Sequence, residues 1–182
     1  MSGDRRSGFW SSSNWVPAII KSALSLNCLP TGDDLVAWIP LDDAAESIVD
    51  FTHNRRTVGK THDLLHVVHP KPISWNDVFE VIVNWFKSNG KDVKLVDYSH
   101  WIELLKKTDE SKMVENPAIK LLPMFTKAAV SKDRRDFVEA MGNPLLETKR
   151  ACAASQKLNN CPPLSKSDIE KWLNSWSKEN FI

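Results

Sequence analysis

Short unbroken runs of apolar residues mark where the chain is expected to form strands. Residues 35–39, LVAWI, have no polar position, as a strand covered on both faces would. Pro40 ends this run because proline cannot donate a backbone hydrogen bond to a neighbouring strand. Residues 64–68 show a second run of this kind, and residues 93–97 a third that is half apolar. The pattern predicts three short strands.

Other segments place their apolar residues three and four positions apart, which is the spacing of one helix face. Between and after the expected strands, this spacing predicts helices over residues 14–26, 42–52, 75–89, 99–107 and 167–178. Asp42 is the expected N-cap of the second helix, and Ser167 with Glu170 forms an expected capping box in the last.

Two further segments carry weaker patterns. Pro117 opens a helical stretch that Pro123 should kink or end. Residues 149–158 are expected to be a short strand or extended segment. Strands that alternate with helices predict an α/β fold in which helix outweighs strand.

Length and charge bound the class of protein. A chain of 182 residues with 42% hydrophobic residues forms one domain or part of one. Its 24 basic and 23 acidic residues give no basic surface for nucleic acid or for an anionic membrane. No apolar run is long enough to span a bilayer, and the first ten residues lack the apolar core of a secretory signal. Three irregularly spaced cysteines favour a reduced, cytoplasmic setting. The cysteines are Cys28, Cys152 and Cys161.

Several polar pairs could carry chemistry, and each has a structural explanation that we prefer. Asp42 and Asp43 stand at a helix start, where capping accounts for them better than an acid–base pair. His66 and His69 lie three apart on an expected strand and should point to opposite faces, so they cannot bind one metal ion. The three cysteines have no histidine or carboxylate nearby in sequence, so buried thiols are expected.

Signatures of nucleotide cofactors are missing from the sequence. No glycine-rich dinucleotide turn can be drawn through the six glycines, and residues 59–61, GKT, lack the first glycine of a P-loop. Tyr98 is followed four positions later by Ile102, so the YxxxK pair of hydride chemistry is absent. Trp172 and Trp176 fit a core stripe better than a ligand box. We therefore assign no catalytic, cofactor-binding or metal-binding residue.

The order of short motifs nevertheless resembles one family. The matching pieces are SGD at residues 2–4, GFW at 8–10, NWVP at 14–17, WIPLDDAA at 38–45, HVVHP at 66–70, SW at 74–75 and the final Trp172, Trp176 and FI. Together they resemble the C-terminal part of the thioester reductase domains that end fungal adenylate-forming reductases, such as aminoadipate-reductase-like and NRPS-like enzymes. These domains are extended short-chain dehydrogenases/reductases.

The resemblance implies a fold and an activity. Residues 1–182 would be a single partial domain, the helix-rich, substrate-side C-terminal part of an extended short-chain dehydrogenase/reductase fold with a few short strands. The family uses NADPH to reduce an acyl thioester, held on a phosphopantetheinyl carrier domain, to an aldehyde. Its glycine-rich loop and its Ser/Thr, Tyr and Lys catalytic residues lie upstream of the matched part, so we expect no cofactor in this chain alone.

The same resemblance implies partners and site residues. The expected partners are the missing N-terminal part of the reductase domain and the carrier domain. Trp10 and Trp15 would be substrate-side residues. Two alternatives stay open: a non-catalytic interaction module that retains the fold, and a fragment of an epimerase-like extended reductase.

Overall fold

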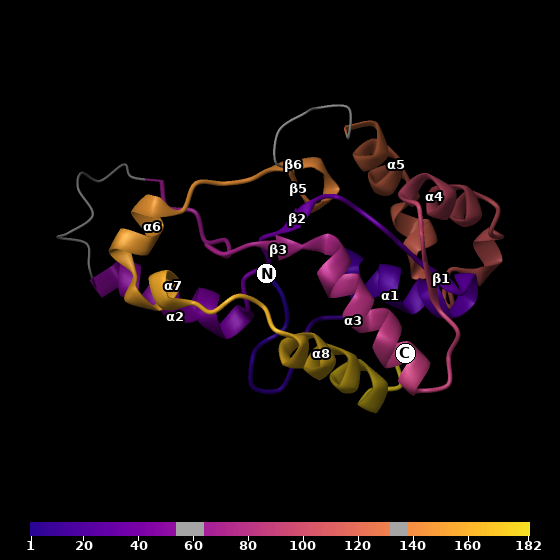
Figure 1. The fold of residues 1–182 in the computed structure, drawn as a ribbon, viewed down its shortest axis with the longest axis horizontal. Coiled ribbons are helices and arrows are strands. Elements are labelled where there is room, and N and C mark those ends of the chain that lie inside the picture. Colours follow the sequence, from indigo (N-terminus) through magenta and orange to yellow (C-terminus); the bar gives the residue numbers. More distant parts are fainter. Residues whose placement is uncertain (54–63, 132–137) are drawn as a thin grey trace.

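The computed structural model describes residues 1–53, 64–131 and 138–182. Helices dominate the fold (Figure 1). The α-helices are α1 (Trp15–Leu26), α2 (Leu41–His53), α3 (Trp75–Ser88), α4 (Tyr98–Lys106), α5 (Leu122–Ser131), α6 (Lys149–Ala154), α7 (Gln156–Asn160) and α8 (Lys166–Lys178). Single 3₁₀ turns are η1 (Glu110–Lys112), η2 (Pro117–Leu121) and η3 (Ala140–Gly142).

The strands are short and form two small sheets. One sheet pairs β1 (Cys28–Pro30) in parallel with β4 (Lys94–Val96). The other has the order β3-β2-β5-β6, built from β2 (Leu35–Val36), β3 (Ile73–Ser74), β5 (Val138–Glu139) and β6 (Asn143–Pro144). β2 is antiparallel to β3 and parallel to β5, and β5 and β6 form an antiparallel pair.

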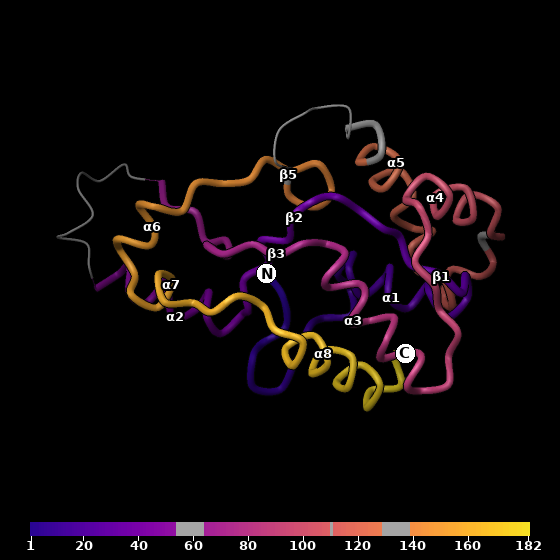
Figure 2. Tube along the Cα trace, in the orientation of Figure 1, coloured from indigo at the N-terminus to yellow at the C-terminus, as the bar shows by residue number. Residues whose placement is uncertain are grey.

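Two apolar clusters hold the molecule together. The larger joins α1, α3, α4, α5 and α8, with Trp101, Trp172 and Trp176 among its largest fully buried side chains. The smaller lies where α2 meets α6 and α7, around Ile39 and Leu158. The chain trace shows the two regions at opposite ends of the molecule, joined by the extended segments around β2 and β3 (Figure 2).

The N-terminal loop crosses between these regions and packs tightly on α8. A Cβ added to Gly3 would come within 2.5 Å of the Trp172 ring, and one added to Gly8 within 2.3 Å of the Lys171 backbone. Gly8 also has a φ of +75°, which L side chains rarely adopt. These two glycines therefore allow the loop to lie against the helix.

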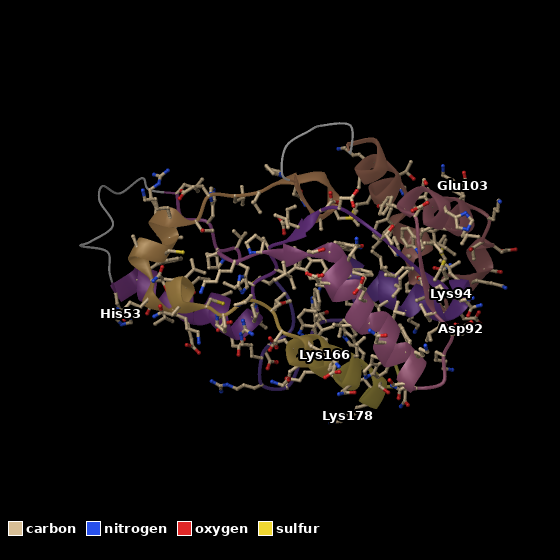
Figure 3. The ribbon with its side chains drawn as sticks, viewed as in Figure 1. His53, Asp92, Lys94, Glu103, Lys166 and Lys178 are labelled. Atoms are coloured by element: carbon tan, nitrogen blue, oxygen red, sulfur yellow. The ribbon has the colours of Figure 1, made fainter. Side chains whose placement is uncertain are left out.

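Charged side chains mark the outer surface of the helical frame. Figure 3 places the labelled His53 at the free end of α2 and Lys166 and Lys178 on α8. Asp92 and Lys94 form an exposed ion pair at the start of β4, with 3.7 Å between Oδ2 and Nζ. Within the described ranges, no helix is long and apolar enough to cross a membrane.

The helix predictions are confirmed, each within two residues at both ends. The five predicted ranges correspond to α1, α2, α3, α4 and α8. The α/β class with more helix than strand is also confirmed. The expected strand over residues 93–97 is β4.

The other two strand predictions need correction. Only Leu35–Val36 of residues 35–39 is a strand, although Val36 to Ile39 are buried as predicted. Residues 64–68 form no strand, because no other described segment of the chain pairs with their backbone. A continuous apolar run indicates burial, but a strand also needs a hydrogen-bonding neighbour.

Several local predictions were wrong as well. Residues 149–158 fall in α6 and α7, and the Ser155 hydroxyl caps α7 by accepting from Leu158 N–H. The helical stretch that Pro117 opens is η2, which ends at Leu121 as predicted, and Pro123 then lies in the first turn of the next helix, α5, where its missing N–H has no cost. The capping box of α8 is Ser165 with Asp168, two residues before the predicted pair.

The predicted cap of α2 was also wrong. This helix begins at Leu41, so Asp42 lies inside its first turn instead of preceding it. The GKT sequence at residues 59–61, weighed above as a P-loop, lies outside the described residues.

Candidate functional site

A hollow of about 260 Å³, counting space open to solvent, lies where the β1–β2 connection meets α3, α4, α5 and η3. Its wall combines aromatic, apolar and polar side chains. The lining residues are Thr31, Gly32, Asp34, Trp75, Tyr98, Ala128 and Met141. Sequence reasoning missed this site because its residues come from five separate segments.

The aromatic wall of the hollow is fixed by hydrogen bonds. Trp75 begins α3, and its indole N–H donates to the Pro30 carbonyl at 2.9 Å. Gly32 N–H donates to Asn76 Oδ1 at 3.1 Å, which holds the loop against the same helix start. A Cβ on Gly32 would lie 3.2 Å from the Trp75 ring. Glycine at this position therefore lets the loop pack closely on the indole.

The opposite wall combines a polar group with a strained residue. The Tyr98 hydroxyl donates to the Phe125 carbonyl at 3.0 Å, which joins the starts of α4 and α5. Burial raises the pKa of Tyr98, and nearby Asp34 adds to the effect, so the phenol stays protonated at neutral pH. Met141 has a φ of +71°, a left-handed conformation that is uncommon for a side chain of this size.

The two tryptophans predicted on the substrate side lie behind this wall, in a contiguous aromatic cluster. Trp15 stacks on Trp75 with 6.1 Å between ring centroids and an interplanar angle of 6°. Trp10 is 7% exposed and contacts Trp38, Trp172 and Trp176. Trp15 thus reaches the hollow only through Trp75, and Trp10 is a further layer away. Their substrate-side role stays a prediction.

A second polar assembly, the Arg5 cluster, ties the N-terminal loop to distant segments. The Arg5 guanidinium binds Asp43 Oδ2 and Asp168 Oδ2, each at 2.6 Å, and the Pro162 carbonyl at 2.6 Å. Lys157 Nζ completes the charge balance at 3.1 Å from Asp43 Oδ1. The cluster comprises Arg5, Asp43, His69, Lys157, Cys161 and Asp168.

The carboxylate at the centre of the Arg5 cluster is held ionised. Burial opposes the charge on Asp43, but hydrogen bonds from Arg5, Lys157 and Cys161 outweigh it and lower its pKa. The sequence-based preference for a structural role is therefore supported, although Asp43 binds side chains instead of capping the helix.

The surroundings of His69 and Cys161 favour a structural role for these two side chains over a catalytic one. Lys71 N–H donates to His69 Nδ1 at 3.0 Å, so the ring proton lies on Nε2 and faces the Pro162 carbonyl at 3.0 Å. Burial lowers the pKa of His69. Burial likewise raises the pKa of Cys161 to about 11, so this thiol is a poor nucleophile despite lying 3.4 Å from His69 Nε2.

The histidines and cysteines that the structure describes do not converge on a metal site. His66 Nδ1 faces the Glu147 carbonyl at 3.0 Å, away from the partners of His69. Across the part of the chain that the structure describes, no group of three His, Cys, Asp or Glu residues could hold a metal ion. Cys161 does have a histidine and a carboxylate beside it, which sequence proximity could not reveal.

Four of the described glycines, Gly3, Gly8, Gly32 and Gly90, do not fit a bound dinucleotide. Gly3 and Gly8 are occupied in packing against α8, and Gly32 packs on Trp75. Gly90 ends α3 in open space. None of these positions begins a glycine-rich turn into a helix, which is what a pyrophosphate requires.

Comparison with known proteins identifies homologues over the length of this chain. The chain is 28% identical over 187 residues to adenylate-forming reductase Nps10 of Heterobasidion annosum, and the match covers 96% of this chain and 16% of the relative. Adenylate-forming reductase Nps11 of Serpula lacrymans is also 28% identical, and the match covers 100% of this chain and 17% of the relative. Non-reducing polyketide synthase sor2 of Hypocrea jecorina is 24% identical over 100% of this chain and 6% of its own length. The chain thus spans less than a fifth of these relatives.

A solved structure shows the same fold. The match to the terminal R domain of the myxalamid PKS-NRPS pathway covers all of this chain and 43% of the R-domain chain, with a TM-score of 0.67 and 20% identity. No family model matches the sequence. The homologues of this chain therefore include fungal adenylate-forming reductases and a polyketide synthase, and its fold is that of part of a terminal R domain.

Proposed function

We propose that this chain forms the substrate-side part of an NADPH-dependent reductase that converts carrier-bound acyl thioesters to aldehydes. The observation that carries the proposal is the match of the whole chain to a terminal R domain, together with reductase homologues over the same residues. On this proposal the chain is inactive alone, because the cofactor turn and the catalytic residues belong to another part of the domain.

The hollow supplies a place for the acyl group. Trp75 and Met141 offer apolar contacts, while Thr31 and Asp34 offer polar groups at the same wall. Mostly apolar hollows with a few polar groups are typical of small-molecule sites. Trp15, stacked behind Trp75, would set the position of that indole, and Trp10 would support the cluster by packing against Trp176 of α8. Phosphopantetheine would deliver the thioester from a carrier domain.

A hybrid reductase tests this function. The residues of Nps10 that align with this chain are replaced by the 182 residues of this chain, and the hybrid is given an acyl thioester on its carrier domain. NADPH oxidation and the aldehyde are measured together. We expect thioester-dependent reduction by the hybrid and none by the isolated chain.

Substitutions then test the hollow. Ala128→Leu fills the hollow and should raise KM for the thioester, whereas Val114→Leu, at a side chain that is 77% exposed, should not. A folded hybrid that oxidises no NADPH would favour the non-catalytic interaction module. Turnover of a sugar nucleotide instead of the thioester would favour the alternative that the chain is a fragment of an epimerase-like extended reductase.

A further inference from the structure

The turn that joins β5 and β6 contains a residue with a strained backbone. The two strands pair through Glu139 and Asn143, and η3 connects them. Within η3, Met141 has a φ of +71° and a ψ of +22°, and Gly142 follows with a φ of +73°. The Asn143 side chain donates to the Ala140 carbonyl at 3.0 Å, which fixes the turn. Glycine adopts this left-handed conformation freely, whereas methionine does so at a cost in free energy, because its Cβ crowds the backbone.

The strained residue lines the hollow. Met141 shares the wall with Ala128 and Tyr98, and its half-buried side chain packs against the larger apolar cluster. The turn itself contacts α5, the helix that carries Ala128. Glycine or asparagine would suit this backbone conformation better than methionine does. The chain therefore keeps a long apolar side chain on this wall in spite of the strain, and strain of this kind is concentrated at functional sites.

The two aromatic side chains of the wall are held in place, whereas Met141 can change its shape. Trp75 stacks on Phe79 with 4.1 Å between ring centroids, and its indole N–H is hydrogen-bonded. The Tyr98 hydroxyl is bonded to the Phe125 carbonyl. Methionine is unbranched, with three rotatable bonds and a polarisable thioether, so it fills gaps of different shape. Among the described lining residues, Met141 is thus the side chain that can adapt to an occupant.

The contacts of the wall favour an aliphatic occupant over an aromatic one. Trp75 is only 3% exposed, because Phe79 and Gly32 already lie against its indole. An aromatic acyl group would therefore find little of this ring to stack on. Ala128 and the thioether of Met141 offer apolar contacts without a flat surface. Such contacts suit a flexible hydrocarbon chain.

We propose that Met141 is a specificity-determining residue, and that the hollow accepts aliphatic acyl groups whose length this side chain accommodates. The thioether closes on a short chain and changes rotamer to make room for a longer one. The residue acts on substrate choice and takes no part in hydride transfer. The inference rests on the proposed function, which supplies the acyl thioester, and it adds the substrate class and the residue that sets its range.

Methyl NMR of this chain tests the contact. The four methionines give separate methyl signals after isotope labelling, and Met141→Leu identifies the signal of Met141 by its loss. S-hexanoyl-N-acetylcysteamine, a soluble acyl thioester, is titrated to millimolar concentration. We expect the methyl signal of Met141 to shift. The signal of Met1, a side chain that is 69% exposed, is the internal control and should stay unchanged.

Substitutions in the Nps10 hybrid test the role in specificity, with kcat/KM measured for butanoyl, hexanoyl and octanoyl thioesters. Met141→Gly opens the hollow and should raise the octanoyl-to-butanoyl ratio of kcat/KM about tenfold. Met141→Leu keeps the side-chain volume but is branched and stiffer, so this ratio should fall about tenfold. Met124→Leu makes the same exchange on α5, at a side chain outside the hollow, and is the matched control that should leave the ratio unchanged.

A purely structural role for Met141 would change kcat/KM by the same factor for all three thioesters, and that result would overturn the inference. An unshifted Met141 methyl signal would also overturn it, and faster reduction of a benzoyl thioester would overturn the substrate class. A hybrid that reduces all three thioesters without any effect of Met141 would refute the inference and leave the proposed function intact. If the hybrid is inactive, the proposed function fails, and calorimetric Kd values of the chain and its variants for the same thioesters decide the inference.

Discussion

Replacing Arg5 by alanine removes the cation that connects three distant segments. The guanidinium, whose side chain is 18% exposed, binds Asp43 of α2 and Asp168 of α8, whose side chains are 3% and 8% exposed. It also donates to the Pro162 carbonyl at 2.6 Å. The variant leaves two nearly buried carboxylates without this partner.

The expected cost follows from what remains after the substitution. Breaking a buried ion pair by removing one partner costs about 3–5 kcal/mol. Lys157 still lies 3.1 Å from Asp43, and Ser165 still donates to Asp168 at 2.7 Å, so the lower end applies. We expect a loss of about 3 kcal/mol in the free energy of unfolding, which corresponds to a fall in Tm of about 6–12 °C.

Urea unfolding followed by circular dichroism measures this loss at neutral pH. Arg6→Ala is the matched control, because Arg6 is exposed in the same loop, and it should change stability by about 0.5 kcal/mol or less. Asp43 loses a partner that holds its pKa down, so acid unfolding of the Arg5 variant should begin at a higher pH. A loss below about 1 kcal/mol would refute the view that Arg5 carries the cluster.

Three further measurements test other parts of the structure. Gly8→Ala should destabilise the fold by roughly 3 kcal/mol and Gly90→Ala by only about 1, since both have a φ of +75° but only Gly8 abuts a backbone, and unfolding curves that coincide would contradict this. Burial lowers the pKa of His69, so the unfolded chain binds a proton near pH 6.5 before the folded chain does, and stability should fall as pH drops below that value. His69→Gln should remove this part of the pH dependence in unfolding titrations. Iodoacetamide should modify half-buried Cys152 in the native chain and reach buried Cys161 only after unfolding, as mass spectrometry of peptides would show.

Local signals were sufficient for most helices. The spacing of apolar residues and nearby start and stop residues predicted α1, α2, α3, α4 and α8, because these signals act within a few residues of each other. They failed at the caps of α2 and α8, where several polar residues compete and only the surrounding contacts select one. The two short helices α6 and α7 were missed because packing on α2 and the Ser155 cap, more than apolar periodicity, stabilise them.

The motifs in the sequence by themselves determined the reductase resemblance, the helix-rich fold and the absence of a cofactor turn. Tertiary structure alone decided which residues meet: Trp75 with Tyr98 at the hollow, and Arg5 with Asp168 across 163 positions. It also decided that residues 64–68 lack a strand partner in the described chain. The physical reason is the same in each case, since side-chain spacing is a local property, whereas a pocket, an ion pair or a β-ladder requires a second segment whose position the sequence does not state.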